Sequence, residues 1–265
     1  MTLVGRVDSL WRYPVKSMRG ERVEELFISF SGAYGDRVFA LYSPSADPGF
    51  PFRTGREQED LLRYQPRFRF PEAAGRPPNL AQADAIAPGI NPLFADRESF
   101  AVDVVTPEGQ VMALDDPALV ADLNARLGEN EEISLVYSQR SFTDCRPVSM
   151  FSLQTARLLS EELQMPVDER RFRANIYLDL DSDQGFAEEE LIGKAVRVGD
   201  KAVVSPVERD PRCKMITLDP ETGEATPRIL RHISAVHNGY AGLYAAVLVE
   251  GVVRPGDALT LVDEL

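Results

Sequence analysis

A cysteine flanked by basic residues is the most reactive group that the sequence offers. Cys213 lies in ERDPRCKMITLDPETGE, with Arg209, Arg212 and Lys214 within four residues of it. Positive charge close to a thiol stabilises the thiolate, the form that attacks electrophiles and ligates metals. The turn-forming residues 219–223 place Cys213 at a strand end or in a loop. By its local sequence alone, an inert, half-buried cysteine is the favoured alternative.

Basic and polar residues also lie beside three other strand-like segments. They are Lys16 and Ser17 in YPVKSM, Arg37 in GDR, and Arg173 and Asn175 in RFRAN. Arginine and lysine, together with hydroxyl and amide donors, suit a phosphate or a pterin-type heterocycle. Taken singly, each basic side chain is instead expected to pair with one of the 42 carboxylates of the chain.

Short strands must position these residues, because β-branched and aromatic residues alternate over segments that glycine and proline separate. The segments are residues 4–18, 24–29, 36–43, 67–70, 101–107, 110–114, 133–138, 175–180, 194–200, 201–207, 244–253 and 256–265. Their spacing is typical of an all-β barrel. The strand–helix alternation of a doubly wound sheet is missing. We therefore expect a mostly β, barrel-type fold with a few helices.

Helical patterns are few. Residues 116–127 have a proline just inside the start and a glycine just past the end, and residues 152–163 have a serine cap before an apolar stripe. Residues 187–192 fit one short helical turn. Residues 71–97 hold five prolines and predict a long irregular loop, which is typical of a functional segment or a lid.

The polar run GENEE at residues 128–132 predicts a domain boundary. We expect two closely packed β-rich domains, residues 1–128 and residues 129–265. The length of 265 residues fits one large domain or two packed ones.

Charge and composition exclude several classes of protein. The chain has 29 Lys and Arg against 42 Asp and Glu, a net charge of −13. This balance disfavours binding to duplex nucleic acid or to an anionic membrane surface. The apolar run at residues 240–249 is far shorter than the roughly 20 residues of a membrane-spanning helix, and no signal peptide is recognisable. We expect a cytoplasmic protein with free thiols.

The remaining metal-ligating residue types show no suggestive spacing. Two cysteines are too few for a four-cysteine zinc site or an iron–sulfur cluster. His232 and His237 are the only histidines, and neither has a partner at metal-ligand spacing. We expect both to be surface or core residues.

Four motifs in one order change the interpretation of the basic residues. YPVKSM, the GDR motif, RFRAN, and RC followed by TLDPETG together resemble the MOSC superfamily. The order resembles its two-part members, in which an N-terminal MOSC β-barrel domain precedes the MOSC domain. The mitochondrial amidoxime-reducing components and their bacterial relatives have this arrangement. The resemblance implies that residues 1–128 are the first domain and residues 129–265 the second.

The resemblance implies a molybdenum-cofactor site. Cys213 matches the cysteine that ligates molybdenum, and Asp144 matches an acidic position near the metal, so both are candidate catalytic residues. The positions that match cofactor contacts are Lys16, Ser17, Arg37, Arg173, Asn175 and Arg212. Cys145 is expected not to be a ligand.

The implied function is a molybdenum-dependent oxidoreductase that reduces N-hydroxylated small molecules. Some bacterial relatives carry a fused ferredoxin domain, which is not seen here, so we expect the electrons to come from a separate ferredoxin-like or cytochrome b5-like protein. The alternative is a carrier of the molybdenum cofactor or of sulfur that turns over no substrate. A degenerate member that binds nothing is disfavoured, because the cofactor positions occur together.

Overall fold

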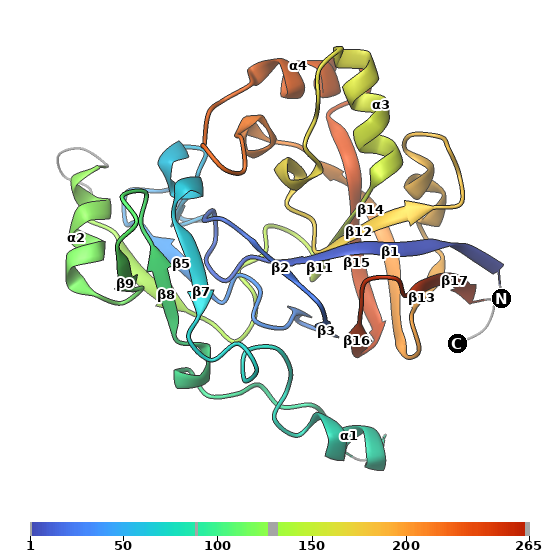
Figure 1. Cartoon of the computed structure of the whole chain (residues 1–265), viewed down its shortest axis with the longest axis horizontal. Coiled ribbons are helices and arrows are strands. Elements are labelled where there is room, and N and C mark those ends of the chain that lie inside the picture. Colours follow the sequence, from blue (N-terminus) through green and yellow to red (C-terminus); the bar gives the residue numbers. More distant parts are fainter. Residues whose placement is uncertain (1, 88–89, 127–131, 263–265) are drawn as a thin grey trace. The chain divides into compact units, whose positions relative to one another are not determined.

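The computed structural model describes residues 2–87, 90–126 and 132–262 (Figure 1). These residues form two compact units, each described here by itself. The barrel unit comprises Met1–Arg12, Arg22–Ala33 and Thr143–Leu265, and the second unit comprises Tyr13–Glu21 and Tyr34–Phe142. Most of the predicted boundary at residues 128–132 lies outside the described residues, so a division at residue 128 stays a prediction.

A closed barrel of seven strands forms the centre of the barrel unit. In order around the barrel, the strands are β1 (Thr2–Arg12), β12 (Ile176–Leu180), β11 (Val148–Ser152), β15 (Tyr240–Val249), β14 (Ala202–Pro211), β13 (Ala195–Val198) and β17 (Ala258–Val262). Neighbours are antiparallel except β11 with β12. The first strand of the chain therefore pairs on both sides with strands from its C-terminal half. The predicted mostly β, barrel-type fold is confirmed.

The pairing of β1 with β12 depends on Gly5. Its φ is 154°, and a Cβ at this position would lie only 2.5 Å from the backbone oxygen of Asp179. Any side chain would push the two strands apart. Gly5 therefore allows the strands to meet closely enough to close the barrel.

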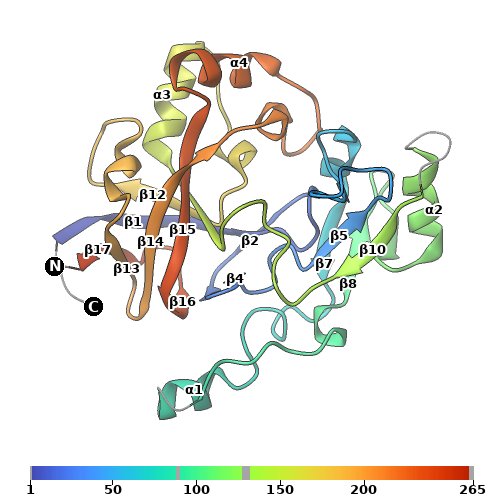
Figure 2. The ribbon, with the colours of Figure 1, turned by 180° about the vertical axis from the view of Figure 1, so that it is seen from behind.

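Two apolar clusters stabilise the barrel unit. Alternate residues of the strands fill the barrel interior, among them Leu10, Met150, Ile176, Val204 and Leu243. Outside it, residues of two helices pack on the strands and on nearby turns, among them Leu159, Phe172, Ile229 and Ile233. The helices, α3 (Leu153–Leu163) and α4 (Pro227–Val236), lie side by side (Figures 1 and 2).

The remaining elements are short. The barrel unit also has β3 (Leu26–Ser29), β4 (Gly32–Ala33), β16 (Gly251–Val253) and the 3-10 turns η3 (Glu169–Phe172), η4 (Ala187–Leu191) and η5 (Lys214–Thr217). The second unit has β5 (Phe39–Tyr42), β6 (Phe52–Arg53), β7 (Gln65–Phe68), β8 (Val102–Val105), β9 (Val111–Ala113), β10 (Ser134–Tyr137), α1 (Leu80–Ile86), α2 (Pro117–Ala125), η1 (Glu59–Arg63) and η2 (Glu98–Phe100). Between them, β2 (Glu21–Val23) pairs with β1.

The local capping signals predicted two helices well. Asp116 caps α2 by accepting from the Ala118 amide at 2.8 Å, and Ser152 caps α3 by accepting from the Thr155 amide at 3.1 Å. The short helical turn predicted at residues 187–192 is the 3-10 turn η4, Ala187–Leu191. The irregular loop predicted at residues 71–97 instead contains α1, whose LAQADAI sequence is rich in helix-forming alanine. No helix among the described residues is both long and apolar enough to span a membrane.

A buried carboxyl group lies below the start of α3. Glu188 is 0% exposed, and its carboxyl oxygens accept from Ser152 Oγ at 2.6 Å and from Thr155 Oγ1 at 2.8 Å. Burial raises the pKa of Glu188 above its ordinary 4.5, although these hydroxyl hydrogen bonds oppose the shift. The folded protein therefore holds the Glu188 proton more tightly than the unfolded chain does.

We expect the stability that Glu188 contributes to decrease as pH rises above about 4.5 toward its raised folded-state pKa. Below that range the contribution is fully present, because folded and unfolded chains both carry the proton. Glu188→Gln keeps the shape and cannot ionise. We measure the unfolding free energies of wild type and Glu188→Gln by urea denaturation across this range. As pH rises, the value for wild type should decrease relative to the value for Glu188→Gln. A pH-independent difference would contradict the expectation.

Candidate functional site

Cys213 lies where the barrel strand β14 ends and the turn η5 begins. Its backbone is extended at φ −118°, and it is the residue that precedes the first turn of η5. The thiol is free and half-buried. The predicted position at a strand end is confirmed. Because its side chain is only partly buried, the thiol is accessible to solvent or to a ligand.

Arg212 fixes the loop that carries Cys213. Its guanidinium pairs with buried Asp210 at 2.7 Å and donates to the backbone oxygens of Phe172 at 3.1 Å and Ala241 at 2.6 Å. The contact with Phe172 joins the RC motif to the RFRAN motif, which lie 40 residues apart in sequence. A Cβ on Gly242 would lie 2.8 Å from Nη2 of Arg212, so glycine makes room for the guanidinium. Arg212 thus has a positioning role in this structure.

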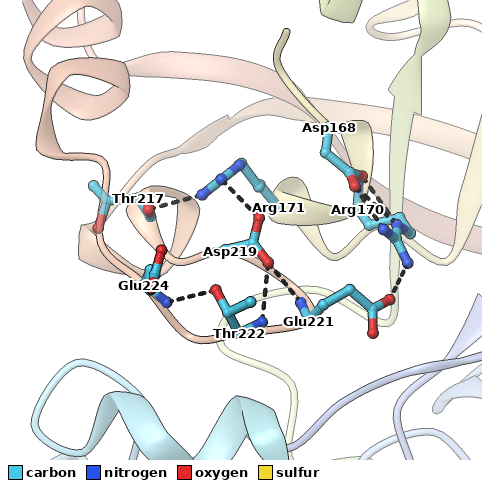
Figure 3. A network of polar contacts seen from close by, with 8 residues as sticks. All are labelled: Asp168, Arg170, Arg171, Thr217, Asp219, Glu221, Thr222 and Glu224. Atoms are coloured by element: carbon cyan, nitrogen blue, oxygen red, sulfur yellow. Dashed lines mark hydrogen bonds and ion pairs between the residues drawn. The ribbon is translucent and has the colours of Figure 1, made fainter.

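A polar network strengthens the same connection between η3 and the segment after Cys213 (Figure 3). Arg171 donates to the backbone oxygen of Thr217 at 2.8 Å and to the carboxylate of Asp219 at 3.1 Å. Asp219 also accepts from the amides of Glu221 and Thr222, and so closes the DPETG turn. Arg171 and Asp219 lie in the RFRAN and TLDPETG motifs, but the sequence analysis did not select either of them as a site residue.

Charges within this network are well compensated. Burial raises the pKa of Asp219, but amide hydrogen bonds from Thr222 and Glu221 and the charge of Arg171 outweigh it, so the net pKa lies below the ordinary 3.8. Arg170 pairs with Asp168 at 2.7 Å and with Glu221 at 2.6 Å. Asp219 therefore stays ionised near neutral pH, and its ion pair with Arg171 holds the segment after Cys213 against η3.

Arg173 ends η3 in the left-handed region, with φ 53° and ψ 38°. Its side chain is half-buried. Left-handed backbone costs a non-glycine residue roughly 1–2 kcal/mol. Such strain gathers at sites where a side chain must point in one direction. Arg173 follows Phe172, so the contact between Arg212 and Phe172 brings the loops of Arg173 and Cys213 together.

Asn175 is 1% exposed and holds strands together. Its Oδ1 accepts from the amide of Ser149 at 3.2 Å, and its Nδ2 donates to the backbone oxygen of Trp11 at 3.3 Å. Its amide hydrogen-bonds to Ser149 and its carbonyl accepts from Trp11 as well. These contacts bind β1 and β11 to the start of β12. A direct cofactor contact of Asn175 stays a prediction.

Asp144 and Cys145 are exposed residues of the barrel unit. The thiol of Cys145 donates to Glu208 at 3.4 Å, beside the ion pair of Arg146 with Glu208 at 2.7 Å. Burial and the neighbouring carboxylate of Glu208 raise the pKa of Cys145 above its ordinary 9.0. A thiol that stays protonated is a poor ligand, which agrees with the expectation that Cys145 does not bind metal.

Lys16 and Ser17 lie in a turn of the second unit. The strand β1 ends before them, at Arg12, so the strand predicted for residues 4–18 is too long. Lys16 is 5% exposed, and its ammonium donates to the backbone oxygen of Phe142 at 2.8 Å. It lies 4.9 Å from the ring centre of Phe50 and 5.7 Å from that of Phe52. These two rings also line a hollow of about 590 Å³ together with Arg53 and Arg56.

Arg37 and Lys16 both hydrogen-bond to the backbone of Phe142. The amide of Phe142 donates to the backbone oxygen of Arg37 at 2.8 Å. The guanidinium of Arg37 pairs with fully buried Asp36 and lies 4.7 Å from the ring centre of Tyr13. The structure therefore brings Lys16, Ser17 and Arg37 together within the second unit.

Backbone strain marks half of the predicted cofactor positions. Among the described residues, six non-glycine residues have positive φ: Ser17, Arg37, Gln164, Arg173, Phe186 and Asn238. Three of them, Ser17, Arg37 and Arg173, were selected from the sequence for other reasons. Because positive φ is uncommon outside glycine, this overlap favours functional constraint at these three residues.

Comparison with known proteins gives two family matches. Residues 4–69 match the MOSC N-terminal beta barrel domain, and residues 137–260 match the MOSC domain. Over 113 residues, or 42% of this chain, the sequence is 37% identical to proteins called molybdenum cofactor sulfurase from Drosophila yakuba and Drosophila melanogaster. The match spans only 13% of the length of each.

Two solved structures are similar in backbone. The YUAD protein from Bacillus subtilis gives a TM-score of 0.46 at 12% identity, over 97% of this chain and 94% of that one. YiiM from Geobacillus stearothermophilus gives 0.35 at 23% identity, over 44% of this chain and 55% of that one.

Proposed function

Because this chain belongs to the MOSC-domain proteins, with a MOSC N-terminal beta barrel domain ahead of its MOSC domain, we propose that it binds the molybdenum cofactor and ligates the metal through Cys213. A function related to the molybdenum cofactor follows from the family and from the molybdenum cofactor sulfurases that it resembles. The direct role of Cys213 is the part that the proposal adds.

The observation that carries the proposal is the position of the Cys213 thiol. It is free and half-buried, and the preceding residue, Arg212, is hydrogen-bonded to Phe172 of the η3 turn. The residues present fit the cofactor, because a thiolate suits a high-valent metal and cationic donors suit a phosphate. Nη2 of Arg212 is also a buried donor with no hydrogen-bond partner among the described residues. An unsatisfied buried donor of this kind is costly unless a ligand or water accepts from it.

We assign different tasks to the basic residues. Arg212 and Arg171 hold the thiol loop in place, because their guanidinium groups are engaged by Phe172, Thr217 and Asp219. Arg173 is proposed to donate to the anionic part of the cofactor. Lys16 and Arg37 are proposed as further donors, with Ser17 as a hydroxyl donor. Asp144, being exposed, is proposed to exchange protons with substrate.

The proposed reaction is the reduction of an N-hydroxylated small molecule. The N–O bond breaks, two electrons and two protons are consumed, and the products are the N–H compound and water. When bound, the molybdenum cofactor supplies the two-electron redox chemistry. A separate redox protein, ferredoxin-like or cytochrome b5-like, is proposed to deliver the electrons.

The second candidate function is transport of the cofactor or of sulfur without turnover. It is favoured by the 37% identity to proteins called molybdenum cofactor sulfurase. In that case Cys213 would carry the cofactor or a persulfide. Both candidates need Cys213, so substitution of this residue does not separate them.

A test of substrate turnover distinguishes the two candidate functions. Protein purified from a host that makes the cofactor should contain about one molybdenum per chain, by elemental analysis. With a viologen dye as electron donor, it should then convert benzamidoxime to benzamidine. Stoichiometric metal without this conversion would support the cofactor carrier, and absence of metal would contradict both the reductase and the cofactor carrier.

A further inference from the structure

Three side chains able to bind a metal meet on the barrel unit, and Cys213 is not among them. Glu162 lies in the last turn of α3, His232 lies on α4, and His237 directly follows α4. Nε2 of His232 lies 2.8 Å and Nε2 of His237 2.7 Å from the same oxygen of Glu162. All three ligand atoms are within 4.8 Å of one another. The sequence shows no partner at metal-ligand spacing for either histidine, and the fold brings one to them from 70 residues away.

We propose that Glu162, His232 and His237 bind a divalent transition-metal ion of the zinc type. Two imidazoles and one carboxylate are a ligand set found in zinc sites that keep one position open. Magnesium and calcium prefer oxygen ligands throughout, so two imidazoles select against them. The site is distinct from the one that contains Cys213.

The observed distances need only a small adjustment to hold such an ion. Zinc bonds of roughly 2.0–2.2 Å in a tetrahedron place neighbouring ligand atoms about 3.3 Å apart. The carboxylate oxygen is now slightly too close to each nitrogen, and the two nitrogens are no more than 4.8 Å apart. Side-chain rotations that displace the ligand atoms by about 1 Å would correct both separations. No movement of α3 or α4 is required.

The site is partly open to solvent. The side chains of Glu162, His232 and His237 are 26%, 21% and 15% exposed. An ion can therefore enter from solution, and a water molecule can occupy the fourth position. Each neutral imidazole would then carry its proton on Nδ1, which leaves the Nε2 lone pair for the metal.

The ring of His237 is held in place without a metal. It stacks on Phe186, with the ring centres 4.3 Å apart and an angle of 26° between the planes. Phe186 is in turn fixed by a hydrogen bond of 2.7 Å from its amide to Thr155 Oγ1. A ligand that is already ordered loses little conformational entropy on binding.

Charge also favours a cation at this site. Glu162 supplies a carboxylate oxygen that faces both imidazoles, and a carboxylate is an anionic ligand for a cation. The net charge of −13 adds an attractive field for any cation that approaches.

The experiment uses the full chain, freed of metal with a chelator and titrated with zinc chloride. Because the protein has only two histidines, the imidazole signals in a ¹⁵N–¹H NMR spectrum report this site alone, whatever the cysteines bind. One equivalent of zinc should shift the signals of both rings. The thermal midpoint should also increase with free zinc, since the ion binds only the folded site.

The variants separate a metal site from a hydrogen-bonded contact between the helices. His237→Gln and Glu162→Gln keep hydrogen-bonding groups at these positions but supply weak metal ligands, so zinc affinity should fall about 100-fold or more in each. Glu161→Gln removes a neighbouring exposed carboxylate from the same helical turn and should change the affinity by less than about threefold. Imidazole signals that do not respond to excess zinc, or a His237→Gln variant that binds zinc as tightly as wild type, would overturn the proposal.

Discussion

Replacing Cys213 with alanine is expected to remove molybdenum from the purified protein and to leave its folding almost unchanged. The thiolate is the one protein–metal bond in the proposed site, so no other bond compensates for its loss. The side chain is half-buried and free, and it makes no hydrogen bond that caps η5. Its removal should therefore change the unfolding free energy by only about 0.5 kcal/mol. Elemental analysis and thermal unfolding on the same sample measure both effects.

Cys145→Ala is the matched control. Cys145 is the only other cysteine, lies in the same unit, and has a thiol whose pKa is raised by burial and by Glu208. This variant should retain the metal content of wild type. Full molybdenum occupancy in Cys213→Ala, or equal loss in both variants, would show that Cys213 is not the specific ligand.

Much of the fold could be predicted because its signals are local. The serine at position 152 and the aspartate at position 116 each cap the helix that the sequence predicts after them. The alternation of apolar residues marked nearly all the barrel strands. The exception is β11, which reads VSMFS. It is buried at every position, so its sequence shows no alternation between buried and exposed residues.

Pairing between distant segments could not be predicted in the same way. Nothing in the local sequence of β1 indicates that it pairs with both β12 and β17. The cluster of Glu162, His232 and His237 has the same origin, because 70 residues separate Glu162 from His232. Packing of α4 against α3 creates the cluster, and α4 itself was not predicted.

Backbone strain was also invisible in the sequence. Left-handed positions are usually recognised by glycine or asparagine, and arginine gives no such signal. Yet Arg173 has φ 53° and ψ 38°, almost the same conformation as Gln164, which ends α3 at φ 52° and ψ 39°. Arg173 and Gln164 can therefore be compared directly. The conformational energy of the left-handed backbone is about the same at both residues, whereas a cofactor contact is proposed for Arg173 alone.

Replacing Arg173 with glycine is expected to weaken cofactor binding. Glycine adopts the left-handed backbone without steric cost, so the conformation at residue 173 is kept while the guanidinium is removed. A charge-assisted hydrogen bond contributes roughly 1.5–3 kcal/mol. Its loss should therefore reduce cofactor affinity by about one to two orders of magnitude.

Gln164→Gly is the control for this prediction. It makes the same backbone change as Arg173→Gly, because the two backbone conformations match. It should leave cofactor content unchanged. Arg173→Lys should restore binding only in part, since an ammonium group lacks the planar fork of the guanidinium. Cofactor affinity in Arg173→Gly within about twofold of wild type, by pterin and molybdenum content after dilution, would mean that Arg173 is strained for another reason.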